Sequence, residues 1–70
     1  MAIRTYRVEG MTCGHCARSV EQEVSEIPGV EGATVDLSAA TVAVESVDEI
    51  PESRVAAAVV EAGYALAGRA

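Results

Sequence analysis

Hydrophobic and polar residues alternate near the start of the chain and then change to a helical spacing. The alternation over residues 3–8 predicts a strand with one buried face, and apolar residues at intervals of three and four from 16 to 27 predict a helix. Pro28 and Gly29 end that helix, because neither residue continues it readily. The faces predicted to be buried hold Tyr6 and Val8 in the strand, and Ala17, Val20, Val24 and Ile27 in the helix. The opposite faces hold Thr5 and Arg7, and then Arg18, Glu21, Gln22 and Ser25.

The second half of the chain shows the same change of period. A strand, a turn at residues 38–40 and a further strand together predict a hairpin. Pro51 and Gly63 match the usual preference for proline at a helix start and glycine just beyond its end, so we expect a second helix from Pro51 to Ala62. Residues 64–67 are left as a short last strand. The buried faces are predicted to hold Ala33, Val35 and Leu37 before the turn, Val42 and Val44 after it, and Val55, Ala58, Val59 and Ala62 in the helix.

The predicted order of elements is strand, helix, strand, strand, helix, strand. This is the split βαβ arrangement of ferredoxin-like folds, an α+β sandwich in which two helices cover one face of a four-stranded antiparallel sheet. With 70 residues the chain is near the lower limit for one hydrophobic core, so we expect a single domain over residues 1–70. The first strand-to-helix connection, residues 9–14, is short and polar, and it brings both cysteines to one end of the sheet.

The charge and hydropathy of the chain argue against several classes of function. Eleven acidic residues against five arginines and no lysine give a net charge of −6, whereas a surface that follows nucleic-acid phosphates needs clustered basic residues. No apolar run approaches the roughly 18 residues of a membrane-spanning helix, so we expect no direct membrane insertion. The first residues show no charged and apolar segments of a signal peptide, which predicts a cytoplasmic protein.

The chemistry of the chain is concentrated in its only two cysteines, Cys13 and Cys16. A disulfide between them would close too small a loop to stabilise the fold much, and thiols persist in a reducing compartment. Thiolates are soft ligands that select Cu(I), zinc or iron-sulfur clusters, and a helix that begins near Cys16 favours the ionised thiolate. Structural zinc sites use four protein ligands and catalytic sites usually three. The spacing alone leaves copper, zinc and dithiol redox chemistry open.

Residues 10–16, with the sequence Gly-Met-Thr-Cys-Gly-His-Cys, and the pair Gly63-Tyr64 resemble the heavy-metal-associated domain family, in particular its free-standing bacterial cytosolic copper chaperones. The resemblance extends over essentially the whole chain, including the order of its elements. It implies a carrier with no enzymatic activity, in which Cys13 and Cys16 lie in an exposed loop and bind Cu(I) in nearly linear geometry. An external thiol, or a second molecule in a copper-bridged homodimer, sometimes supplies a third ligand.

The resemblance also implies a partner, the metal-binding domain of a copper-transporting P-type ATPase, whose own cysteines take the ion by ligand exchange. Several members of the family dock through complementary charge. This acidic chain would then meet a more basic ATPase domain, or bind chiefly through an apolar rim of Met11, Ala17 and Tyr64. The acidic helical faces are equally consistent with an ordinary solvated surface.

Four further residues near the cysteines are candidates for the site. The family buries the matching methionine beneath the loop, which implies a packing role for Met11, although its thioether could also bind metal. Thr12 stands where relatives that prefer zinc or cadmium often carry an aspartate, which favours copper. His15 could bind the metal, tune the thiolates or be an exposed polar residue. Tyr64 matches a tyrosine that lies near the metal loop in bacterial members.

Two other functions remain as alternatives. A small dithiol oxidoreductase would cycle Cys13 and Cys16 through a disulfide, but the chain lacks the aromatic residue and the proline of thioredoxin-like motifs. The other alternative is a carrier domain for zinc, cadmium or mercury, because two thiolates indicate a soft ion and not one particular metal.

Overall fold

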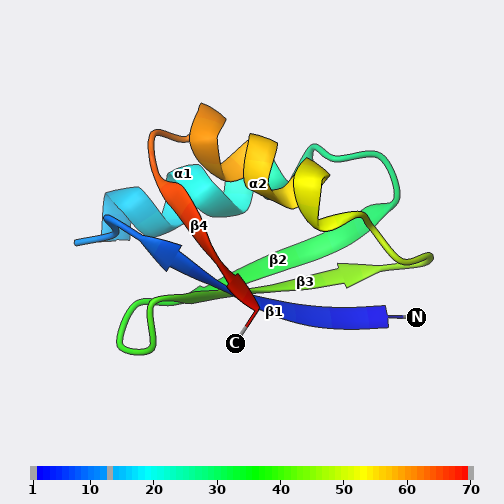
Figure 1. Cartoon of the computed structure of the whole chain (residues 1–70), viewed down its shortest axis with the longest axis horizontal. Coiled ribbons are helices and arrows are strands. Elements are labelled where there is room, and N and C mark those ends of the chain that lie inside the picture. The colour runs from blue at the N-terminus through cyan, green and yellow to red at the C-terminus, as the bar shows by residue number, and fades with distance from the viewer. Residues whose placement is uncertain (1, 13, 70) are drawn as a thin grey trace.

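The computed structural model describes residues 2–12 and 14–69. Within them the elements follow the order predicted from the sequence, with small shifts at their ends (Figure 1). The elements are β1 (Ala2–Glu9), α1 (Gly14–Ser25), β2 (Val30–Asp36), β3 (Thr41–Ser46), α2 (Glu52–Glu61) and β4 (Ala65–Arg69).

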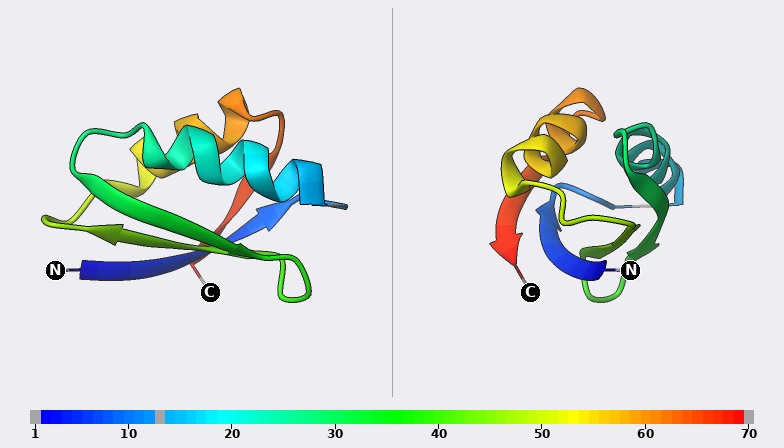
Figure 2. Two further views of the ribbon diagram at one scale, coloured as in Figure 1. Left: turned by 180° about the vertical axis from the view of Figure 1, so that it is seen from behind. Right: turned by 90° about the vertical axis from the view of Figure 1, so that its right-hand side faces the viewer.

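The four strands form one antiparallel sheet in the order β2-β3-β1-β4. Both helices lie on the same face of this sheet, as the two views of Figure 2 show, and they pack against each other as well as against the strands. The predicted ferredoxin-like α+β sandwich is therefore confirmed. Neither α1 nor α2 combines the length and the hydropathy that a helix needs to cross a membrane.

The core lies between the sheet and the two helices and is built mainly from valine. Its largest fully buried side chain is Tyr6, which is 1% exposed. All the fully buried large side chains lie on faces predicted to be buried, because the spacing of apolar residues directly reports which side of a strand or helix meets the core. These side chains are Tyr6, Val8, Val20, Val24, Val42, Val44, Val55 and Val59.

The predicted burial of Leu37 is wrong, because its side chain is 41% exposed. Strand β2 ends one residue earlier, at Asp36, and the carboxylate of Asp36 holds the turn that follows. Its Oδ1 accepts hydrogen bonds from the N–H of Ser38 (3.0 Å), the hydroxyl of Ser38 (2.7 Å) and the N–H of Ala39 (3.3 Å). An aspartate that bonds the backbone two residues ahead starts a turn, so Leu37 belongs to the turn and not to the sheet.

Acid is expected to weaken this turn. The Ser38 hydroxyl and the N–H of Ala39 hold the pKa of Asp36 below its usual value, so the ionised carboxylate stabilises the fold. This stabilisation is fully present above the usual Asp pKa of about 4 and is lost as the pH falls through the lowered value. Asp36→Ala should therefore lower the Tm at neutral pH, and the Tm difference from the parent chain should shrink below about pH 4.

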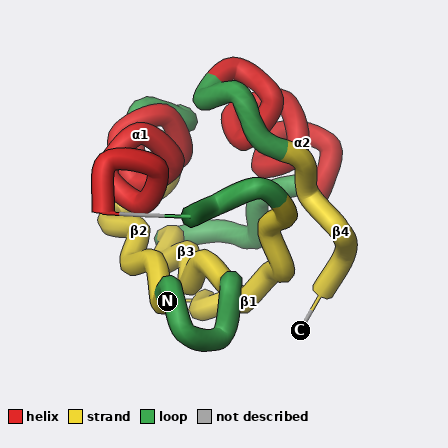
Figure 3. Tube along the Cα trace, turned by 90° about the vertical axis from the view of Figure 1, so that its left-hand side faces the viewer, coloured by secondary structure: helices red, strands yellow, loops and turns green. Residues whose placement is uncertain are grey.

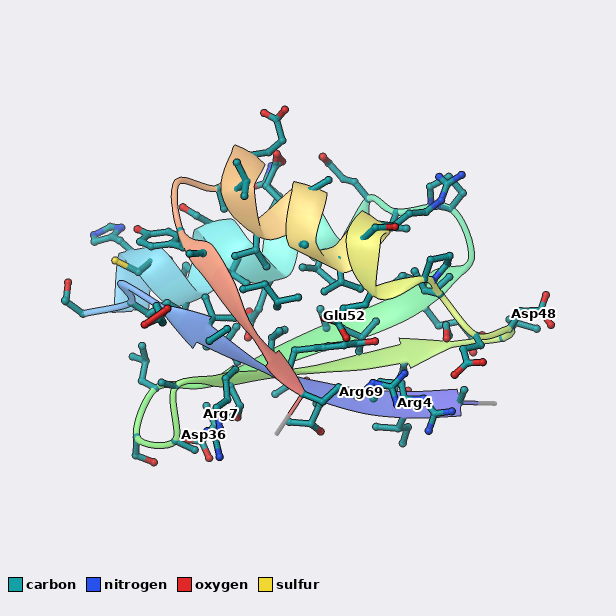
Figure 4. The ribbon with its side chains drawn as sticks, viewed as in Figure 1. Arg4, Arg7, Asp36, Asp48, Glu52 and Arg69 are labelled. Atoms are coloured by element: carbon teal, nitrogen blue, oxygen red, sulfur yellow. The ribbon has the colours of Figure 1, made fainter. Side chains whose placement is uncertain are left out.

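Thermal unfolding followed by circular dichroism at several pH values measures this effect. Asp48→Ala is the matched control, because Asp48 is an exposed aspartate at the opposite end of the sheet from the Asp36 turn (Figure 4). If the two variants lost the same Tm at every pH, the hydrogen bonds of Asp36 would not explain the loss.

Glu21 departs from its predicted outward orientation. It is half-buried, and its Oε2 accepts a 2.8 Å hydrogen bond from the backbone N–H of Val35. Val35 belongs to the edge strand β2, so the Glu21 carboxylate supplies a partner for an edge amide and fastens α1 to the strand. The hydrophobic period of a helix carries no signal for such a bond.

A group of ion pairs joins β1 and β4 to the connection before α2, and β4 also to the first residue of α2. Arg4 Nη2 lies 2.8 Å from Glu49 Oε1, and Arg69 lies 4.0 Å from Glu49 and 3.9 Å from Glu52. Figure 4 shows Arg4, Arg69 and Glu52 gathered around the end of β4. The Arg4 guanidinium holds the pKa of Glu49 below its usual range. Because these side chains are largely exposed, we expect each pair to add little to stability.

Candidate metal centre

The loop after β1, the start of α1 and the connection from α2 to β4 lie at one end of the molecule (Figure 1), and Figure 3 looks onto this end. The connection turns at Gly63, whose φ of +96° lies in the region that favours glycine. The next N–H, that of Tyr64, donates a 3.0 Å hydrogen bond to the carbonyl of Val59. The predicted site residues at positions 11, 12, 15, 16 and 64 are therefore placed at the same end of the sheet.

Tyr64 packs over the backbone that leads into the cysteine motif. A Cβ placed on Gly10 would lie 3.2 Å from Cδ1 of the half-buried Tyr64, so the tyrosine ring covers this glycine closely. Gly10 also has a φ of +97°, a conformation that residues with a side chain adopt only at a cost. Gly10 is thus required both by the backbone and by the approach of Tyr64. Gly10 and Tyr64 both belong to the sequence motif, but the motif does not show that they are in contact.

Valine at position 10 is expected to destabilise the protein and to displace the start of the motif. A left-handed backbone and the short contact with the Tyr64 ring together should lower the free energy of unfolding by about 1–3 kcal/mol. Gly32→Val is the matched control, because a Cβ at Gly32 meets no atom within 4 Å and its φ is not in the left-handed region. Urea unfolding of both variants measures the difference. A Gly10→Val loss no larger than that of the control would contradict the role of the Gly10 backbone.

Cys16 is the third residue of α1 and is only 9% exposed. The resemblance implies an exposed loop for both cysteines, but the helix begins earlier than predicted, at Gly14, and shelters Cys16 in its first turn. The Sγ of Cys16 lies 3.8 Å from Oγ1 of the exposed Thr12, within reach of a weak hydrogen bond. The other predicted ligand, Cys13, lies outside the described residues.

The start of α1 presents a positive electrostatic field despite the negative charge of the whole chain. The first N–H groups of a helix have no partner within it and form the positive end of the helix dipole. The first turn of α1 contains no acidic residue that would oppose this field. The exposed His15 and Arg18 line a shallow depression beside Gly14. From the sequence pattern, Arg18 is expected only on an outward face of the helix. Because the helix begins earlier, at Gly14, His15 is also helical and Arg18 lies beside it.

Met11 is half-buried and packs against the hydrophobic core. This contact fastens the loop to the core just ahead of the cysteine motif, as the packing role implied by the resemblance requires. Direct metal binding by the Met11 thioether or by His15 stays a prediction.

Residues 2–12 and 14–69 contain no group of three His, Cys, Asp or Glu side chains that could hold a metal ion. A closed zinc site needs four protein ligands, and these residues do not assemble one. What they provide at the start of α1 is the sheltered thiol of Cys16, next to the Thr12 hydroxyl and within a first turn that contains no acidic residue.

Comparisons with known proteins place this arrangement among metal-binding domains. The model of the heavy-metal-associated domain matches residues 5–65. The chain is 38% identical over 68 residues to the copper chaperone CopZ of Bacillus subtilis, and the match covers 96% of this chain and 99% of that protein. It is 39% identical over 59 residues to copper-transporting ATPase 1 of Rhizobium meliloti, where the match covers 84% of this chain but 7% of the ATPase. A solved structure of a CopZ metallochaperone is similar with a TM-score of 0.86 at 35% identity, and covers 93% of this chain and 98% of that one.

Proposed function

The chain belongs to the heavy-metal-associated domain family, and from this premise we propose that residues 1–70 form one domain that serves as a cytoplasmic Cu(I) chaperone with Cys13 and Cys16 as its metal ligands. The observation that carries the proposal is the sheltered thiol of Cys16 in the first turn of α1. Its sequence neighbour Cys13 supplies the second thiol, and two thiolates at this spacing can converge on one soft ion. Similarity to a copper chaperone over almost the full length of both chains supports it.

Copper is favoured over zinc by the number and type of donor atoms. Cu(I) is a soft ion that accepts sulfur ligands, whereas zinc sites are completed by further nitrogen, oxygen or sulfur donors. The described residues bring no acidic side chain into the first turn of α1, and Thr12 offers a hydroxyl where a carboxylate would suit zinc. The same lack of further donors keeps a coordination position open, through which the ion can leave.

Delivery would proceed by exchange of thiolate ligands with a partner. Each incoming thiolate of the partner forms a bond to the ion as a bond to Cys16 or Cys13 breaks, so that no free copper is released. The similarity of this chain to a short part of a copper-transporting ATPase supports a partner domain of the same kind. An ion bridged between two copies of the chain is the other way to fill a third ligand position.

Competition between Cu(I) and Zn(II) in anaerobic solution tests the identity of the metal. We expect copper to displace zinc from the parent chain at equal concentrations. Thr12→Asp should move the preference toward zinc, because it adds a hard oxygen donor. Thr12→Asn is the matched control of similar size without the charge. Zinc retained by the parent chain in the presence of equal Cu(I) would contradict a copper chaperone and favour a zinc carrier.

Insulin reduction tests the enzymatic alternative. A dithiol oxidoreductase would turn over many disulfides per molecule by cycling between dithiol and disulfide. We expect no turnover above that of a glutathione control. Sustained catalytic reduction that is lost in the double variant Cys13→Ser/Cys16→Ser would establish the redox function in place of the carrier.

A further inference from the structure

A groove lies between the two helices near the C-terminal end of α1. Its floor is apolar and includes Ile27, Pro28 and Ala58, with Ile27 and Ala58 largely buried. Ile27 lies just beyond the end of α1 at Ser25, and at a rise of 1.5 Å per residue Ser25 is roughly 14 Å along the helix from Cys16. Figure 3 shows the two helices side by side on one face of the sheet. The groove is therefore a surface of its own, separate from the cysteine motif.

Three carboxylates line this groove: Glu23 lies in the last turn of α1, Glu26 just after that helix, and Glu61 at the end of α2. Burial raises the pKa of Glu23, and the neighbouring carboxylates of Glu26 and Glu61 raise it further. Arg54 also lines the groove, but in the part of the chain that the structure describes the ion pairs involve Arg4 and Arg69 instead. The groove therefore has three carboxylates against one guanidinium, so its rim carries an excess of negative charge.

The chemistry of the groove selects among possible occupants. A metal ion does not fit, because the described residues contain no group of three His, Cys, Asp or Glu side chains arranged to hold one. A second copy docked groove to groove would bring the same three carboxylates face to face, and any other contact between copies joins two chains that each carry a net charge of −6. Nucleic acid and anionic membranes carry the wrong sign of charge. A positively charged protein segment satisfies both the apolar floor and the acidic rim.

We propose that this groove is a docking surface for a basic segment of another protein, with an apolar side chain seated on Ile27 and Ala58. Lysine or arginine side chains that flank the apolar residue meet Glu23, Glu26 and Glu61. Burial of one apolar side chain of the partner contributes affinity, and attraction between opposite charges orients the partner segment and speeds its association. The proposal does not depend on the metal-binding function, because its residues lie outside the cysteine motif.

Chemical-shift mapping of the full metal-free chain with a capped synthetic peptide tests this surface. The probe has one central leucine flanked on each side by lysines. We expect the peptide to shift the amide signals of the chain mainly at residues 23–27 and 54–61. The affinity for the peptide should fall by up to about tenfold between about 50 and 200 mM salt, because salt screens exposed charges. Replacing the leucine by serine, or the lysines by glutamates, should weaken binding at least about fivefold.

Two triple variants with the same change in net charge locate the effect. Glu23→Gln/Glu26→Gln/Glu61→Gln should weaken peptide binding at least about fivefold, and removing the mutual repulsion should raise rather than lower its Tm. Glu9→Gln/Glu45→Gln/Asp48→Asn removes three exposed carboxylates elsewhere and should keep the affinity within about twofold. Equal losses in both variants would show attraction to net charge alone and overturn the proposal. Three other results would overturn the proposal as well. The peptide could shift the amides of residues 10–16 instead, which would place its binding at the cysteine motif. The groove amides could shift on dilution of the chain alone, which would indicate a second copy, or with Ca²⁺ or Zn²⁺ alone, which would indicate a metal ion.

Discussion

Replacing Cys16 by serine is expected to abolish useful copper binding while leaving the fold intact. A serine hydroxyl is a hard, neutral donor and cannot replace a thiolate toward Cu(I). Loss of a group that merely supports a metal ligand typically costs 10–100-fold in affinity, so removal of the ligand itself should cost more than about a hundredfold. The change removes little volume, and serine and cysteine have similar helix propensities, so the first turn of α1 that contains Cys16 should persist.

Anaerobic titration with Cu(I) against a chromophoric competitor measures this loss, and far-ultraviolet circular dichroism checks the fold. Thr12→Val is the informative control, because it removes only the hydroxyl that lies 3.8 Å from the Cys16 sulfur, and a weak contact of this length should cost less than about tenfold. The double variant Cys13→Ser/Cys16→Ser has no thiol left and should show no copper binding above the background of the competitor alone. Copper affinity that survives in the double variant would remove the basis of the proposed function.

The sequence contains most of the information that places Cys16, because the core and the order of elements depend on a strong periodic pattern. Tyr6 and Val8 in β1 and Val20 and Val24 in α1 are fully buried, as their spacing predicts. These four side chains fix the strand before the motif and the helix after it. The end of the sheet at which the Cys16 thiol lies therefore follows from hydrophobic periodicity and chain connectivity alone.

The details that the sequence does not reveal depend on polar groups and on single backbone conformations. The start of α1 lies at Gly14, ahead of the first apolar residue that would mark it, because glycine and histidine contribute nothing to a hydrophobic period. The exposure of Leu37 follows from hydrogen bonds to Asp36, and the position of Glu21 follows from one bond to the Val35 amide. Such bonds join residues whose separation follows no period, so only the folded structure shows them.

The contact between Gly10 and Tyr64 is a further example, since it joins two segments more than fifty positions apart in sequence. The motif shows a glycine before Met11 and a tyrosine after Gly63, and both are consistent with a site at this end. The reason for the glycine becomes clear only from the close approach of the ring and the positive φ. Each residue is visible in the sequence, but the constraint between them is tertiary.

Truncation of Tyr6 to alanine is expected to be the most damaging single change to the fold. Tyr6 is 1% exposed and is the largest of the fully buried side chains, and removal of a large buried ring typically costs about 3–5 kcal/mol. A domain of this size has a free energy of unfolding of roughly 4–10 kcal/mol, from about 0.05–0.15 kcal/mol per residue. The variant should therefore lose a large part of its stability, with a much lower midpoint in urea.

Tyr6→Phe separates packing from the hydroxyl, because it keeps the ring that fills the core between β1, α1 and α2. It should unfold at a urea concentration close to that of the parent chain. Tyr6 lies in β1 just ahead of Gly10 and the cysteine motif, so where Tyr6→Ala unfolds, the proposed metal site loses its structural frame. Its affinity for Cu(I) should then fall to that of a peptide with the sequence of residues 10–16, since the fold no longer orders the ligands in advance. Parent-like copper affinity in an unfolded Tyr6→Ala chain would show that the fold contributes nothing to the binding of the metal by its two cysteines.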